Sequence, residues 1–379
     1  MVRGGELGDA VLPFRNPAPR QHFTSLNVVR YVSFRIMAAF ITSLVICLVL
    51  YPWFIRALQK RAVGQHIRSD GPQSHLSKEG TPTMGGALIM VSIIMSGFLW
   101  TQFMNPLVMI TLGLGMVFGI VGFVDDLRKL GSRSSKGLSV RFRLVVEFGA
   151  VVAVMAWFMT QIGSDISYDQ RLFIPFMSAE RYWLDLPLWL YLILAAIVIV
   201  GTSNATNLTD GLDGLAAGPV LTAAGTLLIL TYVTGAKLGG FDISKYLLIP
   251  KVIGAQELSI ICSAVMGATI GFLYYNTYPA EIFMGDTGSL GLGGLLGAMA
   301  VLTKNELLSV IIFGVFFFEA VSVILQTTYF KFTRRRIFPM SPVHHSFELM
   351  GWPEPKIVVR FWIISLLLAM VALASIKVR

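Results

Sequence analysis

The feature that most limits how this chain can fold is a series of long apolar runs. A helix needs about 20 consecutive apolar residues to cross the hydrocarbon core of a bilayer. Ten runs of roughly this length occur, with approximate limits 34–56, 84–103, 107–125, 144–162, 187–203, 213–233, 258–275, 288–302, 307–328 and 359–376. Only 13% of the 379 residues are charged, against about a quarter in a soluble domain. The sequence therefore predicts an all-α, polytopic integral membrane protein with about ten transmembrane helices.

The distribution of lysine and arginine predicts the orientation of these helices. With ten spans, the connecting segments 56–80, 126–143 and 329–360 lie on one side of the membrane, and they hold 17 of the 30 basic residues. Basic connecting segments usually face the cytoplasm, so we expect both termini to be periplasmic. Residues 1–25 are expected to form an irregular N-terminal segment, and residues 26–379 a single transmembrane domain.

Two adjacent acids, Asp125 and Asp126, close the third apolar run, and Arg128 and Lys129 follow directly. Charge at the end of a membrane helix is costly enough to indicate a function. Consecutive helical residues point about 100° apart, so we expect the helix to end near the acids if both face one site. Paired carboxylates suit a divalent cation and phosphate chemistry. A polar stop at the membrane boundary is the alternative interpretation.

A second polar segment, 204–214, lies on the same predicted side and contains no lysine or arginine. Polar residues recur at every third position, which keeps them near one face of a helix or tight turn. Gly211 and Gly214 would let the backbone approach a ligand closely. A helix cap formed by one of the acids is the alternative interpretation. The four recurring residues are Asn204, Asn207, Asp210 and Asp213.

A third polar segment, 276–289, contains Asp286 among glycines, an arrangement that favours a metal or phosphate site. Phe283 precedes it by three residues, where a flat ring could stack on a nucleotide base. Ordinary packing at the membrane interface would also explain this aromatic residue. The segment therefore predicts a metal-binding acid with an aromatic contact close by.

Two other candidates lie in the basic segments. His344 and His345 follow the run Arg334 to Arg336 and could bind phosphate, metal or a carboxylate, although a pair of loop histidines can equally be only solvated. Lys78 stands before a glycine-rich helix start and could contact phosphate. Carboxylates, glycines, lysines and an aromatic on one membrane face fit Mg²⁺-assisted phosphoryl transfer between a nucleotide and a lipid.

The segments that carry these residues resemble the bacterial phospho-N-acetylmuramoyl-pentapeptide transferases, a family of polyprenyl-phosphate sugar-1-phosphate transferases. The resemblance covers nearly everything after about Leu26, and it rests on the segments 71–86, 122–129, 201–216, 272–290 and 336–362. One departure is Ser346, which stands where the family usually has a third consecutive histidine. We therefore expect this position to lie outside the reacting centre.

The resemblance implies an active site at the cytoplasmic face of a bacterial inner membrane. Undecaprenyl phosphate would attack UDP-N-acetylmuramoyl-pentapeptide to give lipid I and UMP, the first membrane step of peptidoglycan synthesis, with roles in cell wall biogenesis, cell shape and cell division. Mg²⁺ is the implied cofactor and Asp286 its ligand. A homodimer is left open, and no nucleic acid partner is expected. The implied catalytic residues are Asp125, Asp126, Lys129, Asp286, His344 and His345, and the implied substrate contacts are Lys78, Thr83, Asn204, Asn207, Asp210, Gly211, Leu212, Asp213, Asn276, Phe283 and Gln326.

Three alternatives stay open at this stage. Within the reaction, direct attack by the lipid phosphate competes with an aspartyl-phosphate intermediate on Asp125 or Asp126. A related transferase could use a UDP-N-acetylhexosamine and share the acidic motifs. A transporter with intramembrane carboxylates is a different class, but transporter sites lie near the bilayer midplane, commonly between repeats. Here the acids are expected at the cytoplasmic ends of the helices, and the sequence shows no repeat.

Overall fold

The computed structural model describes residues 24–60, 80–132, 137–161, 168–238 and 241–377, and within them most of the chain is helical. A short 3₁₀ helix, Thr24–Arg30, precedes the first long helix. The α-helices are α1 (Val32–Lys60), α2 (Gly86–Trp100), α3 (Pro106–Ser132), α4 (Val140–Gln161), α5 (Leu188–Thr209), α6 (Ala217–Gly235), α7 (Ile243–Tyr246), α8 (Leu258–Asn276), α9 (Gly285–Leu302), α10 (Ser309–Ile312), α11 (Gly314–Thr333), α12 (Val343–Leu349) and α13 (Glu354–Ala374).

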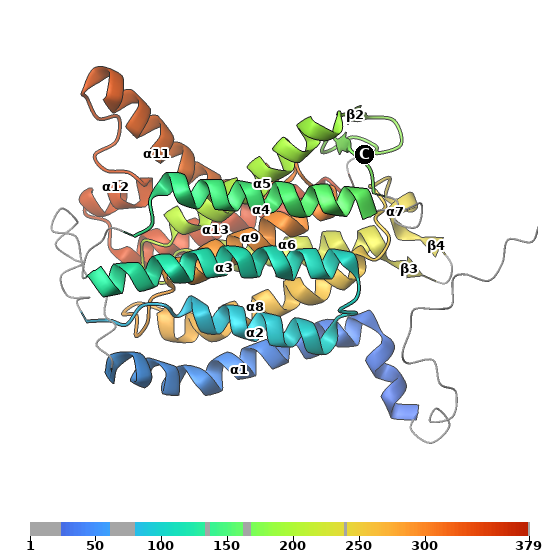
Figure 1. Ribbon diagram of the computed structural model, residues 1–379, viewed down its shortest axis with the longest axis horizontal. Helices are drawn as coiled ribbons and strands as arrows, with labels where there is room; N and C mark the ends of the chain where they lie inside the picture. Colours follow the sequence, from blue (N-terminus) through green and yellow to red (C-terminus); the bar gives the residue numbers. More distant parts are fainter. Residues whose placement is uncertain (1–23, 61–79, 133–136, 162–167, 239–240, 378–379) are drawn as a thin grey trace, which may run out of the picture.

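Ten of these helices coincide with the ten predicted spans and run side by side in one bundle (Figure 1). Within the described residues, eight are long and apolar enough to cross a membrane. The other two are α2, with 15 residues, and α9, with 18. The prediction of an all-α, polytopic membrane protein is therefore confirmed. Helix α1 begins and α13 ends at the same end of the bundle, at the right of Figure 1.

Two small β-hairpins also lie at that end of the bundle (Figure 1). In the first, β1 (Arg171–Phe173) pairs antiparallel with β2 (Trp183–Asp185). In the second, β3 (Lys237–Leu238) pairs antiparallel with β4 (Phe241–Asp242). A 3₁₀ turn, Ala255–Glu257, leads from this region into α8. The hairpins fall in the segments expected on the periplasmic side, so the acidic motifs lie at the opposite end.

Helix α9 is the centre of the bundle. Every residue from Thr287 to Leu302 is buried, and α9 packs chiefly against α3 and α5. Glycines make this approach possible: a Cβ on Gly122 of α3 would lie 2.2 Å from the Asp286 carbonyl oxygen, and one on Gly86 of α2 would lie 2.1 Å from the Gly288 Cα. Contacts this short leave no room for a side chain. The backbones of three helices therefore meet at the beginning of α9.

Two helices extend further than the sequence predicts. Helix α3 does not end near Asp125 but continues to Ser132, so the expected helix end at the acid pair is wrong. The continuation is stabilised because Lys129 lies one turn after Asp125 and pairs with it. Helix α5 likewise continues through Asn204 and Asn207 to Thr209, so these amides lie on a helix end and not in a loop.

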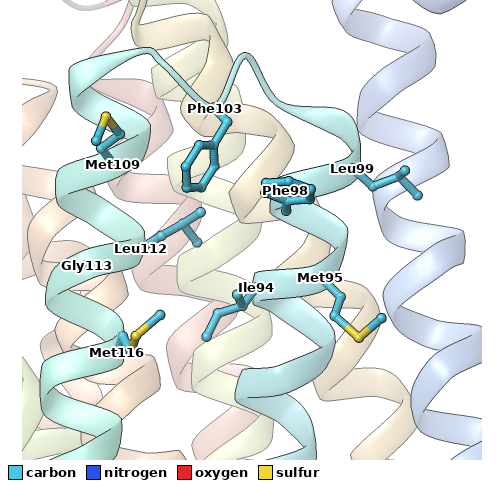
Figure 2. Close-up of a pocket in the computed structure, with 9 residues that line it drawn as sticks. All are labelled: Ile94, Met95, Phe98, Leu99, Phe103, Met109, Leu112, Gly113 and Met116. Atoms are coloured by element: carbon cyan, nitrogen blue, oxygen red, sulfur yellow. The ribbon is translucent and has the colours of Figure 1, made fainter.

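A groove between α2 and α3 has a volume of about 500 Å³ and is lined by apolar residues of both helices and their connection (Figure 2). Phe98 and Phe103 lie at one end of it and Met116 at the other. Because Met116 precedes Asp125 by nine residues, it lies roughly 14 Å from the acid pair along α3. The groove holds no titratable side chain and is not a candidate for phosphate chemistry.

Candidate active site

Three carboxylates from two helices meet where α3 passes the beginning of α9. Asp125 and Asp126 of α3 are 2% and 4% exposed, respectively. The carboxyl groups of Asp125 and Asp286 are in hydrogen-bonding contact with each other. Two carboxylates cannot share such a contact without a proton or a cation between them. The structure thus brings together acids that are 161 residues apart in the sequence.

Lys129 supplies a positive charge to this pair. Its Nζ lies 2.7 Å from Asp125 Oδ2 and 2.8 Å from Asp286 Oδ2. The backbone N–H of Leu138 also donates to Asp125 Oδ1. Asp125 is therefore held from two sides while its carboxyl group still faces Asp286.

Asp126 points to a different group of atoms. Its carboxylate accepts hydrogen bonds from the backbone N–H groups of Asp286 and Thr287, at 3.1 and 3.0 Å, and from the Thr287 hydroxyl at 2.7 Å. An acid in this position satisfies N–H groups that the first turn of a helix leaves unpaired. The two adjacent acids can serve one site because Asp125 faces the Asp286 side chain and Asp126 faces its backbone.

Helices α4 and α5 add a polar network on the far side of Asp286. Asn207 donates from Nδ2 to Asp286 Oδ1 at 2.9 Å and also to Ser289 Oγ. Arg143 donates to Asn204 Oδ1 at 2.8 Å and approaches Asp286 Oδ2 to 3.8 Å. Asn204 in turn donates from Nδ2 to the buried Glu147. Asp286 is thereby fixed between Lys129, Asn207 and Arg143.

The site crowds several carboxyl groups together. Asp210, at the end of α5, accepts a hydrogen bond from the Gly285 backbone, next to Asp286. Burial, and then repulsion from Asp286 and Asp126, raises the pKa of Asp210 to about 8. Lys129 and Arg143 are the bases nearest to Asp286 among the described residues. A further cation at this site would therefore be electrostatically favoured.

The residues present fit Mg²⁺. Within the described residues, no three His, Cys, Asp or Glu side chains form a ready metal cage. Mg²⁺ seldom uses such a cage, because it keeps several waters and binds one or two carboxylates together with substrate phosphates. Asp286 and Asp125 present two carboxyl groups in contact, which is the donor chemistry that this ion requires.

The residues expected to bind the base lie in two turns that are hydrogen-bonded to each other. Asn276, at the end of α8, accepts from the Gly214 N–H at 2.9 Å and donates to the Ile282 carbonyl at 2.8 Å. Asp213 accepts from the Ala280 N–H at 3.0 Å. These bonds join the turn after α5 to the turn before α9. The buried Leu212 and the partly exposed Gly211 belong to the first of these turns.

Phe283 lies in the second turn, and its backbone is fixed although its side chain is only half-buried. Its N–H donates to the Pro82 carbonyl at 2.9 Å, and its carbonyl accepts from the Gly85 N–H at 2.8 Å. Thr83, from the same strand-like segment, places its hydroxyl beside Gly285. Lys78 lies outside the described residues. Two site residues, Lys78 and Thr83, were expected near the first basic segment. Of these, the structure describes only Thr83, and it lies beside Gly285.

The histidine segment forms α12 and packs on α11. His344 is fully buried, and its Nδ1 lies 3.2 Å from Glu319 Oε2. His345 is partly exposed and pairs with Glu348 at 2.7 Å. Ser346 hydrogen-bonds to both the N–H and the carbonyl of Met340, so it holds its own loop together. The three positions have three different surroundings.

Gln326 has a local structural contact. Its Oε1 accepts from the N–H groups of Ile337 and Phe338, and its Nε2 donates to the Phe338 carbonyl. The side chain of Gln326 therefore bonds to the connection between α11 and α12. The structure does not bring it into contact with the carboxylates.

Several residues of the site were missed by the reasoning from sequence. Thr287 and Ser289 carry no charge and gave no signal. Glu147 and Glu319 could have been found, because an acid inside a membrane helix is a functional candidate on energetic grounds alone. Arg143 was counted only for orientation, although its spacing of four from Glu147 predicts a pair on one helix face.

Comparison with known proteins gives consistent matches. Residues 108–304 match the model of glycosyl transferase family 4. A protein of Sorangium cellulosum named phospho-N-acetylmuramoyl-pentapeptide-transferase is 51% identical over 358 residues, which cover 93% of this chain and 95% of that one. Proteins of the same name from Syntrophus aciditrophicus and Desulfatibacillum aliphaticivorans are 48% and 50% identical, over 94% and 95% of this chain and 97% of each relative.

Proposed function

Because the chain belongs to glycosyl transferase family 4 and, within it, to the phospho-N-acetylmuramoyl-pentapeptide transferases, we propose that it makes lipid I. It is a membrane-embedded phosphoglycosyl transferase related to peptidoglycan synthesis. In the proposed reaction it transfers phospho-N-acetylmuramoyl-pentapeptide from the UDP-linked form to undecaprenyl phosphate, and UMP is the second product. This would be the first membrane step in building the cell wall, on which cell shape and division depend.

The observation that carries this proposal is the contact of Asp125 with Asp286, bridged by Lys129 at the end of the bundle. Phosphoryl transfer requires little covalent chemistry from the protein, and its rate comes mainly from positioning and charge stabilisation. A cation-binding carboxylate next to fixed positive charges offers both. The position at a helix end also lets a lipid phosphate arrive from the membrane and a nucleotide from water.

In the proposed mechanism an oxygen of undecaprenyl phosphate attacks the sugar-bound phosphorus, and the bond from that phosphorus to the bridging oxygen of the diphosphate breaks. That oxygen leaves as part of UMP. The second pKa of a phosphate monoester is about 6. At pH 7 the lipid phosphate is therefore largely dianionic and needs little help from a base. Asp125 orients the lipid phosphate and takes its remaining proton where one is present. A route through an aspartyl phosphate on Asp125 or Asp126 is the alternative.

Mg²⁺ would be held by Asp286 and would neutralise charge on the diphosphate when it is bound. Lys129 and Arg143 lie beside the same carboxylate and would contact phosphate oxygens. Asp126 fixes the backbone that carries Asp286. Each of these tasks is assigned to a residue that touches Asp286.

The nucleotide would bind beside the carboxylates, with its uracil ring on Phe283. The turns joined by Asn276 and Asp213 would form one side of this nucleotide site, and their hydrogen bonds to each other support this proposal. His345 would contact the phosphate-bearing part of a substrate, since its ring is partly exposed. Further substrate contacts are proposed for Lys78, Thr83, Asn204, Asn207, Asp210, Gly211, Leu212 and Gln326.

We also propose a location for the enzyme. It would be a multi-pass protein of a bacterial inner membrane, with the site facing the cytoplasm and both termini in the periplasm. The support is the concentration of basic residues in the segments on the side of the site. A homodimer would be compatible with this arrangement.

The test is a reconstitution with purified protein in detergent or liposomes. UDP-N-acetylmuramoyl-pentapeptide and undecaprenyl phosphate are supplied, and lipid I and UMP are both quantified, with and without a chelator of Mg²⁺. Equimolar lipid I and UMP that require Mg²⁺ are expected. Product formation from UDP-N-acetylglucosamine but not from the muramoyl substrate would contradict the proposed specificity. Trapping of a phosphorylated Asp125 or Asp126 would contradict direct attack.

A further inference from the structure

Glu319 is an acid in the second turn of α11, and its side chain is completely buried. The residues around it in sequence, Phe316 to Phe318 and Ala320 to Val323, are apolar except for Ser322. A charged side chain at such a place in a membrane helix costs several kcal/mol. The cost is offset when the charge is paired, and the partner of Glu319 is His344 of α12, with Nδ1 3.2 Å from Oε2.

The pair is poorly satisfied as a structural contact. Both Glu319 oxygens and both His344 nitrogens are buried and have no hydrogen bond of good geometry among the described residues. Each unsatisfied buried group costs about 1–3 kcal/mol. An apolar pair of similar volume would stabilise the fold at least as well. Stability alone therefore does not explain why an acid and a histidine occupy this position.

The surroundings of His344 lead to the candidate active site. Its Nε2 lies so close to Gly211 that a Cβ on this glycine would be 2.2 Å away. Gly211 follows Asp210, which accepts a hydrogen bond from the Gly285 backbone beside Asp286. On its other side, the His344 ring lies 4.1 Å from the ring of His345, measured between centroids. His344 thus contacts both the turn after α5 and the partly exposed His345.

We propose that Glu319 is a positioning residue for the transferase reaction. Its carboxylate, 3.2 Å from Nδ1, holds the His344 ring against α11, so that Nε2 faces Gly211 and α12 is packed against the turn after α5. This seating presents His345 to the phosphate of the bound substrate. His344 is then a buried link in this chain and does not touch substrate itself. The inference rests on the proposed function, because only a reaction at the carboxylates gives the seating a purpose.

The test compares Glu319→Gln with wild type and with Glu306→Gln as the matched control. Glu306 is another fully buried acid, but it pairs with Lys304 and Tyr191 and lies beyond the far end of α9. Glu319→Gln keeps the shape but lacks the charge that fixes the imidazole. Turnover should fall about 10- to 100-fold, by analogy with removing a carboxylate that orients a metal-binding histidine. The KM for the nucleotide substrate and the Tm should stay close to wild type, as should the turnover of Glu306→Gln.

A double mutant separates positioning from independent roles. Glu319→Gln combined with His344→Gln should be no slower than His344→Gln alone, because residues that act as one unit are not additive. Losses that multiply in the double mutant would overturn the proposal. Wild-type turnover in Glu319→Gln would also overturn the proposal. The same holds if the fall in turnover is fully explained by a lower fraction of folded protein.

A measurement without substrate keeps this inference distinguishable from the proposed function. Amide hydrogen exchange of residues 343–349 should be faster in Glu319→Gln, while exchange in α9 is unchanged. If the wild-type protein makes no lipid I, the proposed function fails, yet the exchange result still tests the seating of α12. Unchanged exchange at 343–349 would overturn the positioning role even in an active enzyme.

Discussion

The carboxylate of Asp126 and the side chain of Thr287 are joined by a 2.7 Å hydrogen bond, and the Thr287 N–H donates to the same oxygen at 3.0 Å. The residues are 161 positions apart, and the bond fixes the first turn of α9 against α3. Asp286 lies in that turn. The sequence predicts a catalytic role for Asp126, and its contacts show that it also positions Asp286, the proposed Mg²⁺ ligand.

We therefore predict that Thr287→Val weakens the apparent affinity for Mg²⁺. A hydrogen bond to a charged group is worth about 1.5–3 kcal/mol, so the Mg²⁺ concentration for half-maximal turnover should rise about 10-fold or more. Thr287→Ser keeps the hydroxyl and is the matched control. An unchanged Mg²⁺ requirement in the valine variant would show that α9 is held without this bond.

Asp286→Asn should remove most activity, because an amide is a poor ligand for Mg²⁺. The loss of several kcal/mol of charge stabilisation corresponds to more than about 100-fold in turnover. Lipid I formation is measured across a range of Mg²⁺ concentrations, with Asp169→Asn as the control, since Asp169 is half-exposed and pairs with Arg171 beside β1. Near wild-type rates at limiting Mg²⁺ would rule out the ligand role.

Phe283→Ala should weaken binding of the nucleotide substrate by about 5- to 150-fold, because stacking of a base on an aromatic ring is worth about 1–3 kcal/mol. Phe283→Trp should keep more of the affinity. Affinity for undecaprenyl phosphate should change much less, because this lipid has no base. Titration calorimetry with folded variants gives both values, and equal nucleotide affinity in the alanine variant would mean that Phe283 only packs at the interface.

Ser346→Ala should leave turnover within about threefold of wild type, whereas His345→Ala should lower it clearly. The reason is that Ser346 is 1% exposed and bonds only to Met340 among the contacts that the structure gives it. Alanine is the appropriate replacement, since a buried serine leaves little space for a histidine. Loss of turnover in Ser346→Ala with unchanged folding would place this position in the reacting centre.

Much of the architecture could be predicted from the chain alone. Apolar runs of bilayer length gave the ten long helices, and the gathering of Asp125, Asp126 and Asp286 at one end follows from counting spans. Helix ends could not be placed in this way. Helix α3 continues past Asp125 because Lys129 pairs with that acid one turn later, and hydropathy does not record such pairs.

The connections within the site were also beyond the sequence. Asp126 meets Thr287 through packing of helices that are distant in the chain, and Glu319 meets His344 because α12 folds back on the helix before it. Spacing rules describe neighbours on one helix and say nothing about which faces of two helices meet. A sequence motif presents Asp125 and Asp126 as equivalent. Their separate contacts become visible only in the structure, where Asp125 faces the side chain of Asp286 and Asp126 faces its backbone.

The close approach of Gly86 to Gly288 has a consequence for how such an enzyme can diversify. Helix α9 has no space in which to slide or rotate, since any added carbon at these glycines would have to displace a backbone. Natural selection for a different donor sugar would therefore act on partly exposed positions away from this contact, such as Gly211, Phe283 and His345. Asp286 would stay in place while its surroundings change, so one buried scaffold can be inherited by enzymes of different specificity.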